Sequence, residues 1–138
     1  MIRRFALAGL LAASLAAPVA FAQPEDTSKV PRLTMAEFKK LHAARQVLPI
    51  DVRDPHSFDA GHIPGAVNVS FVDVEISANR LLKEKRTIVA YCACPNEHSS
   101  LGVAAKLMRV GVKDIRVLVG GWDGWKASGG KVEVTPQQ

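Results

Sequence analysis

Stretches with a helical pattern alternate along the chain with stretches that have a strand pattern. Residues 34–37 form a capping box, and apolar side chains at Phe38 and Leu41 continue it, so we expect a helix that ends near residue 45. Helical spacing also predicts helices over 72–82 and 101–111, and a short helix with two tryptophans should follow Gly120 and Gly121. Apolar, β-branched runs predict strands over the following ranges: 47–52, 66–70, 87–91 and 115–119.

Strands that alternate with helices predict a parallel sheet with helices on both faces, an α/β architecture. The run 87–91 is almost continuously apolar, as expected for a strand buried on both faces. Ligands of such sheets bind beyond the carboxyl ends of the strands. Cys92 directly follows this strand and precedes a predicted helix, so we expect it at that position.

The N-terminus has the pattern of an export signal. Arg3 and Arg4 precede an apolar run over 5–17, and Ala20 to Ala22 form an A-x-A cleavage site. The run is shorter than the roughly 20 residues of a membrane span. We therefore predict a signal peptide over 1–22, cleavage after Ala22, no stable membrane insertion afterwards, and a periplasmic or secreted protein.

Beyond the signal we expect a flexible lead-in over 23–32, one domain over 33–131 and a C-terminal tail over 132–138. Two of the positive charges behind the net charge of +5 belong to Arg3 and Arg4 and would leave with the signal. The remaining basic residues are scattered and are not interleaved with aromatic residues. Nucleic acid is therefore not an expected partner.

The chain has only two cysteines, Cys92 and Cys94. A disulfide between them would close a very small loop and would constrain little of the unfolded chain, which argues against a purely structural role. A cysteine between a strand end and a helix N-terminus lies among inward-pointing N–H groups, which stabilise a thiolate or persulfide anion. We therefore expect the pKa of the Cys92 thiol to lie below the value of about 8.5 for a free cysteine, and we expect Cys92 to act as a nucleophile.

Three segments in order resemble the rhodanese-like domain family: "LPIDVRDPHSFDAGHIPGAVNV", "IVAYC" with its following loop, and "VLVGGWDGW". The resemblance runs from about Thr34 to Lys131. It implies a five-stranded parallel sheet with helices on both faces, and a sulfurtransferase that carries a sulfane sulfur on a cysteine persulfide. By position that cysteine is Cys92. Asp51 and Arg53 resemble a support at the end of a neighbouring strand.

The loop after Cys92 would cradle the outer sulfur of the persulfide. Its residues are Ala93, Cys94, Pro95, Asn96, Glu97 and His98. The family loop usually has a glycine where Pro95 stands and a basic residue where Glu97 stands. Proline lacks an N–H, and Glu97 brings a negative charge, unless it instead caps the following helix. Thiosulfate, a dianion, is therefore an unexpected donor.

His98 lies where cysteine-dependent phosphatases have an arginine, and a histidine lacks the bidentate fork that binds phosphate. His62, beside a turn, is expected to be structural. Trp122 and Trp125 are expected to pack the last helix.

Cys94 leaves two hypotheses open besides simple sulfur transfer. In the first, Cys94 is a resolving thiol that attacks Cys92 and forms a strained, labile disulfide, which would suit thiol redox chemistry. In the second, Cys92, Cys94 and His98 bind a soft metal such as Cu(I). We expect no resident metal or organic cofactor, and the expected partners are a small sulfur-containing substrate or a thiol acceptor protein.

Overall fold

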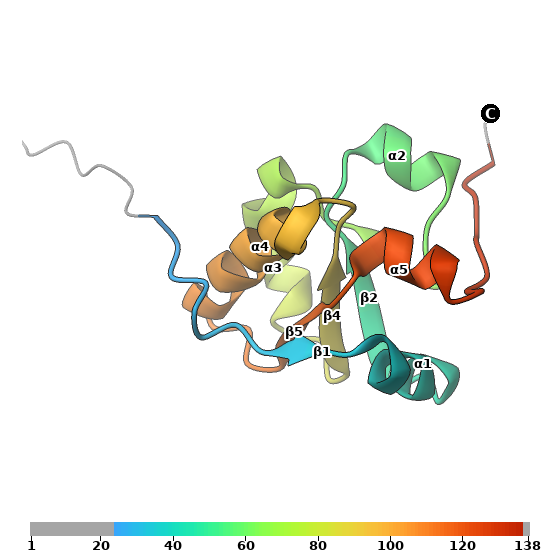
Figure 1. Cartoon of the computed structure of the whole chain (residues 1–138). Coiled ribbons are helices and arrows are strands. Elements are labelled where there is room, and N and C mark those ends of the chain that lie inside the picture. The colour runs from blue at the N-terminus through green and yellow to red at the C-terminus, as the bar shows by residue number, and fades with distance from the viewer. Residues whose placement is uncertain (1–23, 137–138) are drawn as a thin grey trace, which may run out of the picture.

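The computed structural model describes residues 24–136. The predicted signal peptide over 1–22 lies outside this range. Five parallel strands form one sheet in the order β1-β5-β4-β2-β3, which confirms the expected fold class (Figure 1). The strands are β1 Arg32–Leu33, β2 Val47–Asp51, β3 Val67–Asn68, β4 Thr87–Tyr91 and β5 Ile115–Leu118.

The helices are α1 Met35–Ala43, α2 Pro55–Ala60, α3 Val74–Leu81, α4 His98–Arg109 and α5 Gly121–Ala127, with 3-10 turns at Phe71–Asp73 and Pro95–Glu97. The predicted capping box of α1 is present: the Thr34 side chain accepts from the Glu37 N–H, and the Glu37 carboxylate accepts from the Thr34 N–H. The predicted helices over 72–82 and 101–111 correspond to α3 and α4. α4 begins at His98, earlier than its apolar period indicates.

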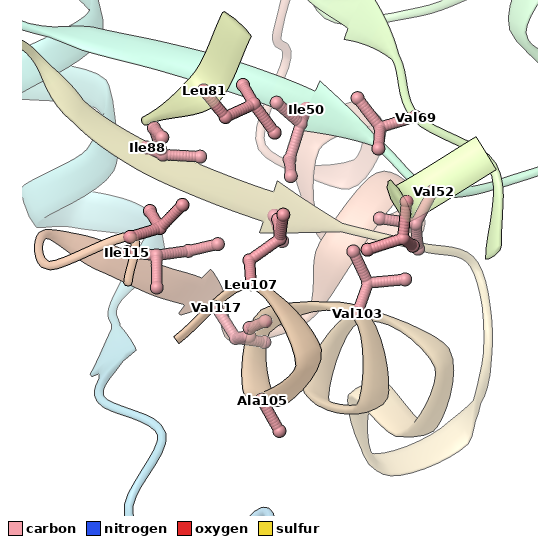
Figure 2. Close-up of a cluster of buried hydrophobic side chains, with 14 of the residues drawn as sticks. Ile50, Val52, Val69, Leu81, Ile88, Val103, Ala105, Leu107, Ile115 and Val117 are labelled. Atoms are coloured by element: carbon pink, nitrogen blue, oxygen red, sulfur yellow. The ribbon is translucent and has the colours of Figure 1, made fainter. Parts of the chain in front are cut away.

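Alternate residues of the central strands face two separate cores. Ile50, Ile88 and Val117 pack against α3 and α4, and Figure 2 shows Val103 and Leu107 of α4 among them. The residues between them face the other way: Val89 lies with Phe38 of α1 and with both tryptophans of α5. The burial of Trp122 and Trp125 confirms that they pack the last helix. Because side chains of β4 pack in both cores, the carboxyl end of this strand is fixed from both faces of the sheet.

Residues before and after the predicted domain also contact it. Val30 is buried, Glu25 pairs with Arg109 of α4 at 3.0 Å, and the Pro31 carbonyl accepts from the Val117 N–H at 2.9 Å. Residues 24–31 therefore contact the domain that follows them. After α5, Glu133 pairs with His62 in an isolated antiparallel bridge, so the described part of the tail lies beside α2.

Within residues 24–136, no helix has the length and apolar character needed to cross a membrane.

Candidate functional site

Cys92 lies at the carboxyl edge of the sheet, where its position after β4 predicted it. Its side chain is 4% exposed and belongs to the core between the sheet and α3 and α4. Its carbonyl accepts a 2.8 Å hydrogen bond from the Trp122 N–H at the start of α5. The residue is thus fixed from both faces of the sheet.

Gly121 makes this close contact of α5 with the cysteine residue feasible. Its φ is +51°, a left-handed conformation that side chains rarely adopt, and a Cβ atom there would collide with the carbonyl oxygen of Cys92. The "GG" of the third sequence motif therefore has a packing reason: only glycine allows the start of α5 to approach the residue that bears the sulfur.

Cys92 and Cys94 are joined in a disulfide, with 5.7 Å between their Cα atoms. Both cysteines of the chain are in this bond. The structure therefore shows the site in its oxidised form, in which Cys92 cannot act as a nucleophile until the disulfide is reduced.

Polar groups of the first turn of α4 lie against both sulfur atoms. The Ser99 N–H donates to Cys94 Sγ at 3.3 Å, and Ser100 Oγ lies 3.5 Å from Cys92 Sγ. Ser100 is fully buried, and its hydroxyl donates to the Glu97 carbonyl at 3.0 Å. The N-terminus of a twelve-residue helix adds partial positive charge at this point. A thiolate on either sulfur would face these donors and this charge.

The loop between the strand and α4 contains two consecutive left-handed residues, Asn96 and Glu97, with φ of +54° and +55°. Pro95 has no N–H, and the His98 N–H donates to the Pro95 carbonyl. Pro95 and His98 therefore offer no free N–H to the predicted cradle over 93–98. The groups that contact the sulfurs are instead the Ser99 N–H, which donates to Cys94 Sγ, and the Ser100 hydroxyl, which lies 3.5 Å from Cys92 Sγ. The sequence did not single out either serine.

The Glu97 carboxylate connects the loop over 93–98 to two other parts of the chain. One carboxylate oxygen accepts from the Gly120 N–H and the other pairs with Arg32, both at 3.0 Å. It makes no cap hydrogen bond to α4, so the alternative that Glu97 caps this helix is wrong. The carboxylate is drawn toward β1 and the β5–α5 turn because both provide hydrogen-bond donors.

His98 is exposed at the start of α4. It lines a cavity of about 300 Å³ together with residues of the lead-in, of α4 and of the turn before α3: Pro24, Glu25, Thr27, Phe71, Ser99 and Gly102. In the described part of the chain, no three His, Cys, Asp or Glu side chains are grouped so that they could hold a metal ion. The three ligands of the copper hypothesis are therefore not assembled in this form of the site.

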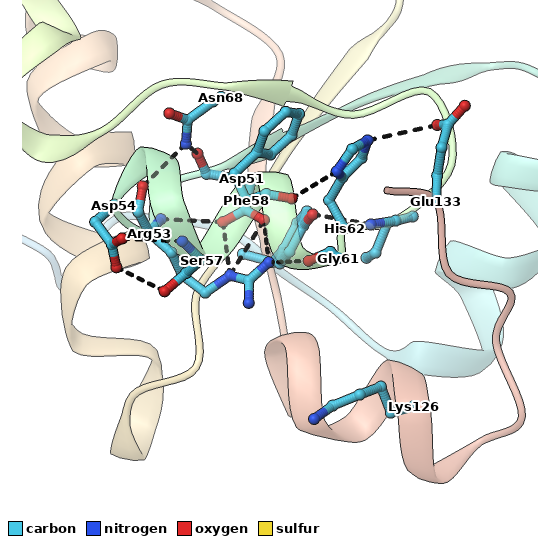
Figure 3. A network of polar contacts seen from close by, with 12 residues as sticks. Asp51, Arg53, Asp54, Ser57, Phe58, Gly61, His62, Asn68, Lys126 and Glu133 are labelled. Atoms are coloured by element: carbon cyan, nitrogen blue, oxygen red, sulfur yellow. Dashed lines mark hydrogen bonds and ion pairs between the residues drawn. The ribbon is translucent and has the colours of Figure 1, made fainter. Parts of the chain in front are cut away.

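Asp51 and Arg53 form a buried pair at the end of β2, next to β4 (Figure 3). Arg53 donates to both carboxylate oxygens of Asp51, at 2.9 and 2.6 Å, and to the Gly61 carbonyl at 2.6 Å. Burial opposes the charge on Arg53, but the hydrogen bonds and charge of Asp51 outweigh it and raise the pKa of Arg53. Its guanidinium lies 4.5 Å from the ring centre of Trp122, whose N–H bonds Cys92. The pair thus lies against the residue whose N–H bonds the Cys92 carbonyl.

Tyr91 is a further residue near the site that the sequence reading left unassigned. It is fully buried, and its hydroxyl oxygen accepts from the Ile63 N–H at 3.1 Å. Burial and the charge of Asp51 raise its pKa. The signal in the sequence was a tyrosine in a strand predicted to be buried, because a buried tyrosine hydroxyl needs a hydrogen-bond partner.

His62 has the structural place expected for it. Its Nδ1 donates to the Phe58 carbonyl at 2.8 Å, and its ring stacks on that of Phe58 at 3.8 Å between centres. Its Nε2 lies 3.6 Å from a Glu133 carboxylate oxygen, as Figure 3 shows. These contacts tie the "GHIPGA" turn to α2 and to the tail, away from the cysteine loop.

The fold and the cysteine loop define a class of protein, and comparison with known families agrees with it. Residues 34–128 match the family described as Rhodanese-like domain. The match covers well over half of the chain, so this protein belongs to the rhodanese-like domain family, and residues 34–128 form one such domain.

Individual relatives support the same assignment. The chain is 31% identical over 96 residues to the thiosulfate sulfurtransferase GlpE of Coxiella burnetii, a match that covers 70% of this chain and 87% of the relative. The Alr3790 protein of Anabaena superimposes with a TM-score of 0.66 at 28% identity, over 75% of this chain and 80% of the other. The BH2092 protein of Bacillus halodurans has a TM-score of 0.68 at 24% identity, over 76% and 77%, and supports the fold alone. The family match and the GlpE relative place the chain in a sulfurtransferase-like family.

Proposed function

We propose that the reduced protein is a sulfurtransferase that carries a sulfane sulfur on Cys92. The observation that carries the proposal is the position of this sulfur: it follows the central strand and faces the N-terminus of α4 and the Ser100 hydroxyl. Membership in the rhodanese-like family, with a GlpE-type relative at 31% identity, supports the reaction class.

In the first half of the reaction the Cys92 thiolate attacks the outer, sulfane sulfur of a donor. A sulfur–sulfur bond forms to Cys92 while the bond to the rest of the donor breaks, and the donor leaves with that electron pair. In the second half a thiophilic acceptor attacks the outer sulfur of the persulfide. Cys92 then departs as a thiolate, and no net oxidation of the protein occurs.

The site can stabilise the anions of both steps. A charged sulfur is stabilised by nearby N–H and O–H donors and by the partial positive charge of a helix N-terminus. The Ser100 hydroxyl, which now donates to the Glu97 carbonyl, can turn its hydrogen toward a charged sulfur 3.5 Å away. The same groups would stabilise the persulfide after the transfer.

The loop favours a donor with less negative charge, such as an organic persulfide, over thiosulfate. From Ala93 to His98 the loop has no lysine or arginine, and Glu97 brings a carboxylate. That carboxylate pairs with Arg32 and accepts from the Gly120 N–H, so the positive charge of Arg32 is not free to bind a dianion. A donor with less negative charge is repelled less by the Glu97 carboxylate and depends less on a basic residue for binding.

We also propose that the protein works outside the cytoplasm after removal of the signal over 1–22. Its acceptor would then be a thiol of a small molecule or of another exported protein. The proposal rests on the basic start, the apolar run and the A-x-A site. The N-terminal sequence of the protein recovered from the periplasm should begin at Gln23, and an uncleaved cytoplasmic product would contradict export.

A donor screen tests the sulfurtransferase proposal. Reduced parent and Cys92→Ser proteins are supplied in turn with thiosulfate, mercaptopyruvate and inorganic polysulfide, and thiocyanate formed from cyanide is measured. The parent should be active with at least one donor, and Cys92→Ser should be inactive with every donor. Equal activity of the two proteins would remove Cys92 from the mechanism.

A further inference from the structure

We infer that Cys94 is a resolving thiol that discharges the Cys92 persulfide as sulfide, so that the protein has a reductive, sulfide-releasing activity besides sulfur transfer. This inference rests on the proposed persulfide at Cys92. Its own support is the Cys92–Cys94 disulfide that the structure contains. That bond is the product this reaction would leave on the protein.

The loop geometry brings the two sulfurs into reach of each other without a change in the fold. The Cα atoms of Cys92 and Cys94 lie 5.7 Å apart, inside the range of protein disulfides. The left-handed residues Asn96 and Glu97 turn the chain so that Cys94 faces the first turn of α4. Glu97 then anchors the turn to Arg32 and Gly120. Both sulfurs therefore belong to one anchored loop.

The environment of Cys94 suits an attacking sulfur. The Ser99 N–H donates to its Sγ at 3.3 Å and would favour the thiolate in the reduced protein. Cys94 is also partly exposed, whereas Cys92 is 4% exposed. The buried sulfur would hold the persulfide, and its more accessible neighbour would resolve it.

The step is balanced in atoms and electrons. Cys94 Sγ bonds to Cys92 Sγ, and the bond between Cys92 Sγ and the outer sulfur breaks. The outer sulfur leaves as hydrosulfide with the bonding electron pair and the proton of the Cys94 thiol. The sulfane sulfur is reduced by two electrons, which come from the two cysteine thiols as they become a disulfide.

Two thiol equivalents must then restore the reduced site, supplied by a dithiol protein or by two molecules of a small thiol. Cys94, which is partly exposed, is the more accessible point of attack. Cys92 then leaves as the thiolate that Ser100 and the start of α4 stabilise. The partner that completes the cycle is thus a thiol reductant, and its supply decides whether the protein turns over.

A single-turnover experiment without added thiol tests the inference. The fully reduced, thiol-free parent, Cys94→Ser and Cys92→Ser proteins are mixed with inorganic polysulfide and then freed of it. Sulfide released afterwards and the intact mass of each protein are measured. The parent should release about one sulfide per protein as its mass falls by two hydrogens. Cys94→Ser should keep the mass of one added sulfur and release no sulfide, and Cys92→Ser should gain no sulfur.

The outcomes separate this inference from the proposal on which it rests. If the parent retains its added sulfur as stably as Cys94→Ser, the persulfide stands and the resolving role of Cys94 is overturned. If Cys94→Ser releases sulfide as fast as the parent, Cys94 is likewise excluded. If neither parent nor Cys94→Ser gains sulfur or releases sulfide, the Cys92 persulfide fails and the inference falls with it. Cys94→Ala, treated in the same way, controls for effects of the new hydroxyl.

Discussion

Gly121 shows most directly how single residues fix the site. Two separate demands meet there: a left-handed φ of +51° and close packing against the Cys92 carbonyl. Gly129 meets only the first: its φ is +75°, and no atom lies within 4 Å of the position that a Cβ would take there.

We therefore predict that Gly121→Ala destabilises the protein far more than Gly129→Ala. Gly129→Ala should cost about 1–2 kcal/mol, the usual cost of a left-handed alanine. Gly121→Ala should cost at least about 2 kcal/mol more, because α5 must also move away from Cys92. Urea unfolding of both variants measures the difference. Equal losses would mean that the close approach of α5 to Cys92 is not a constraint.

Tyr91 gives a prediction about alkaline pH. Burial and the charge of Asp51 raise its pKa in the folded protein above its ordinary value of about 10. Folding thus favours the neutral phenol, and this contribution is complete below pH 10 and is lost as the pH rises above 10. Because Tyr91 is the only tyrosine, phenolate absorbance reports it alone.

We expect the phenolate signal to appear above pH 10 together with the loss of folded structure seen by circular dichroism. Tyr91→Phe should remove this component of the pH dependence, at the cost of the acceptor for the Ile63 N–H. A phenolate that titrates near pH 10 in a protein that stays folded would contradict the buried position of Tyr91.

Glu97 shows what single residues in the sequence do not reveal. The sequence showed that a carboxylate stands where the family usually has a basic residue. The partners of the Glu97 carboxylate are Arg32, 65 positions away, and the Gly120 N–H. Both become its neighbours only when β1, β5 and the cysteine loop meet at one edge of the sheet. Local sequence could not identify these contacts, because they depend on strand order.

At the scale of elements, α4 links the hydrophobic core to the site. Its first turn faces the two sulfurs, and Val103 and Leu107 pack in the core farther along the helix. Leu107 is fully buried, whereas Arg109 in the last turn is exposed and pairs with Glu25.

Leu107→Ala should lower the free energy of unfolding by about 2–5 kcal/mol, as large-to-small core substitutions do. Arg109→Ala, on the same helix, should cost about 1 kcal/mol or less, because exposed ion pairs contribute little. Chemical denaturation of the two variants gives both values. A loss for Leu107→Ala no greater than that for Arg109→Ala would mean that α4 is not held by this core.

Elements with an apolar pattern of their own were predictable, whereas α2 and β1, which lack one, were not. β4 was predicted to the residue, and α1 was marked by its capping box. The six-residue α2 was missed because it has no buried residue and so no apolar period, although Asp54 and Pro55 mark its start. The two-residue β1 was missed because its pairing with β5 defines it, not its own composition.

At the scale of the whole molecule, a parallel sheet covered on both faces brings separate chain segments to one edge. The carboxyl ends of β2 and β4 supply the Asp51–Arg53 support and Cys92, and α5 connects them through Trp122. The position of Cys92 could be predicted because a strand end is a local signal. The roles of Ser99 and Ser100 could not, since they depend on where α4 begins.

The proposed sulfur transfer requires that the site stabilise a negatively charged sulfur at position 92. The most direct measurement is the rate at which the reduced Cys94→Ser protein reacts with an alkylating agent as the pH is varied, which reports the ionisation of Cys92. We predict a half-maximal rate clearly below pH 8.5, the usual pKa of a free cysteine, and a shift toward higher pH when Ser100 is replaced by alanine. A midpoint at or above about 8.5, unchanged by Ser100→Ala, would contradict it.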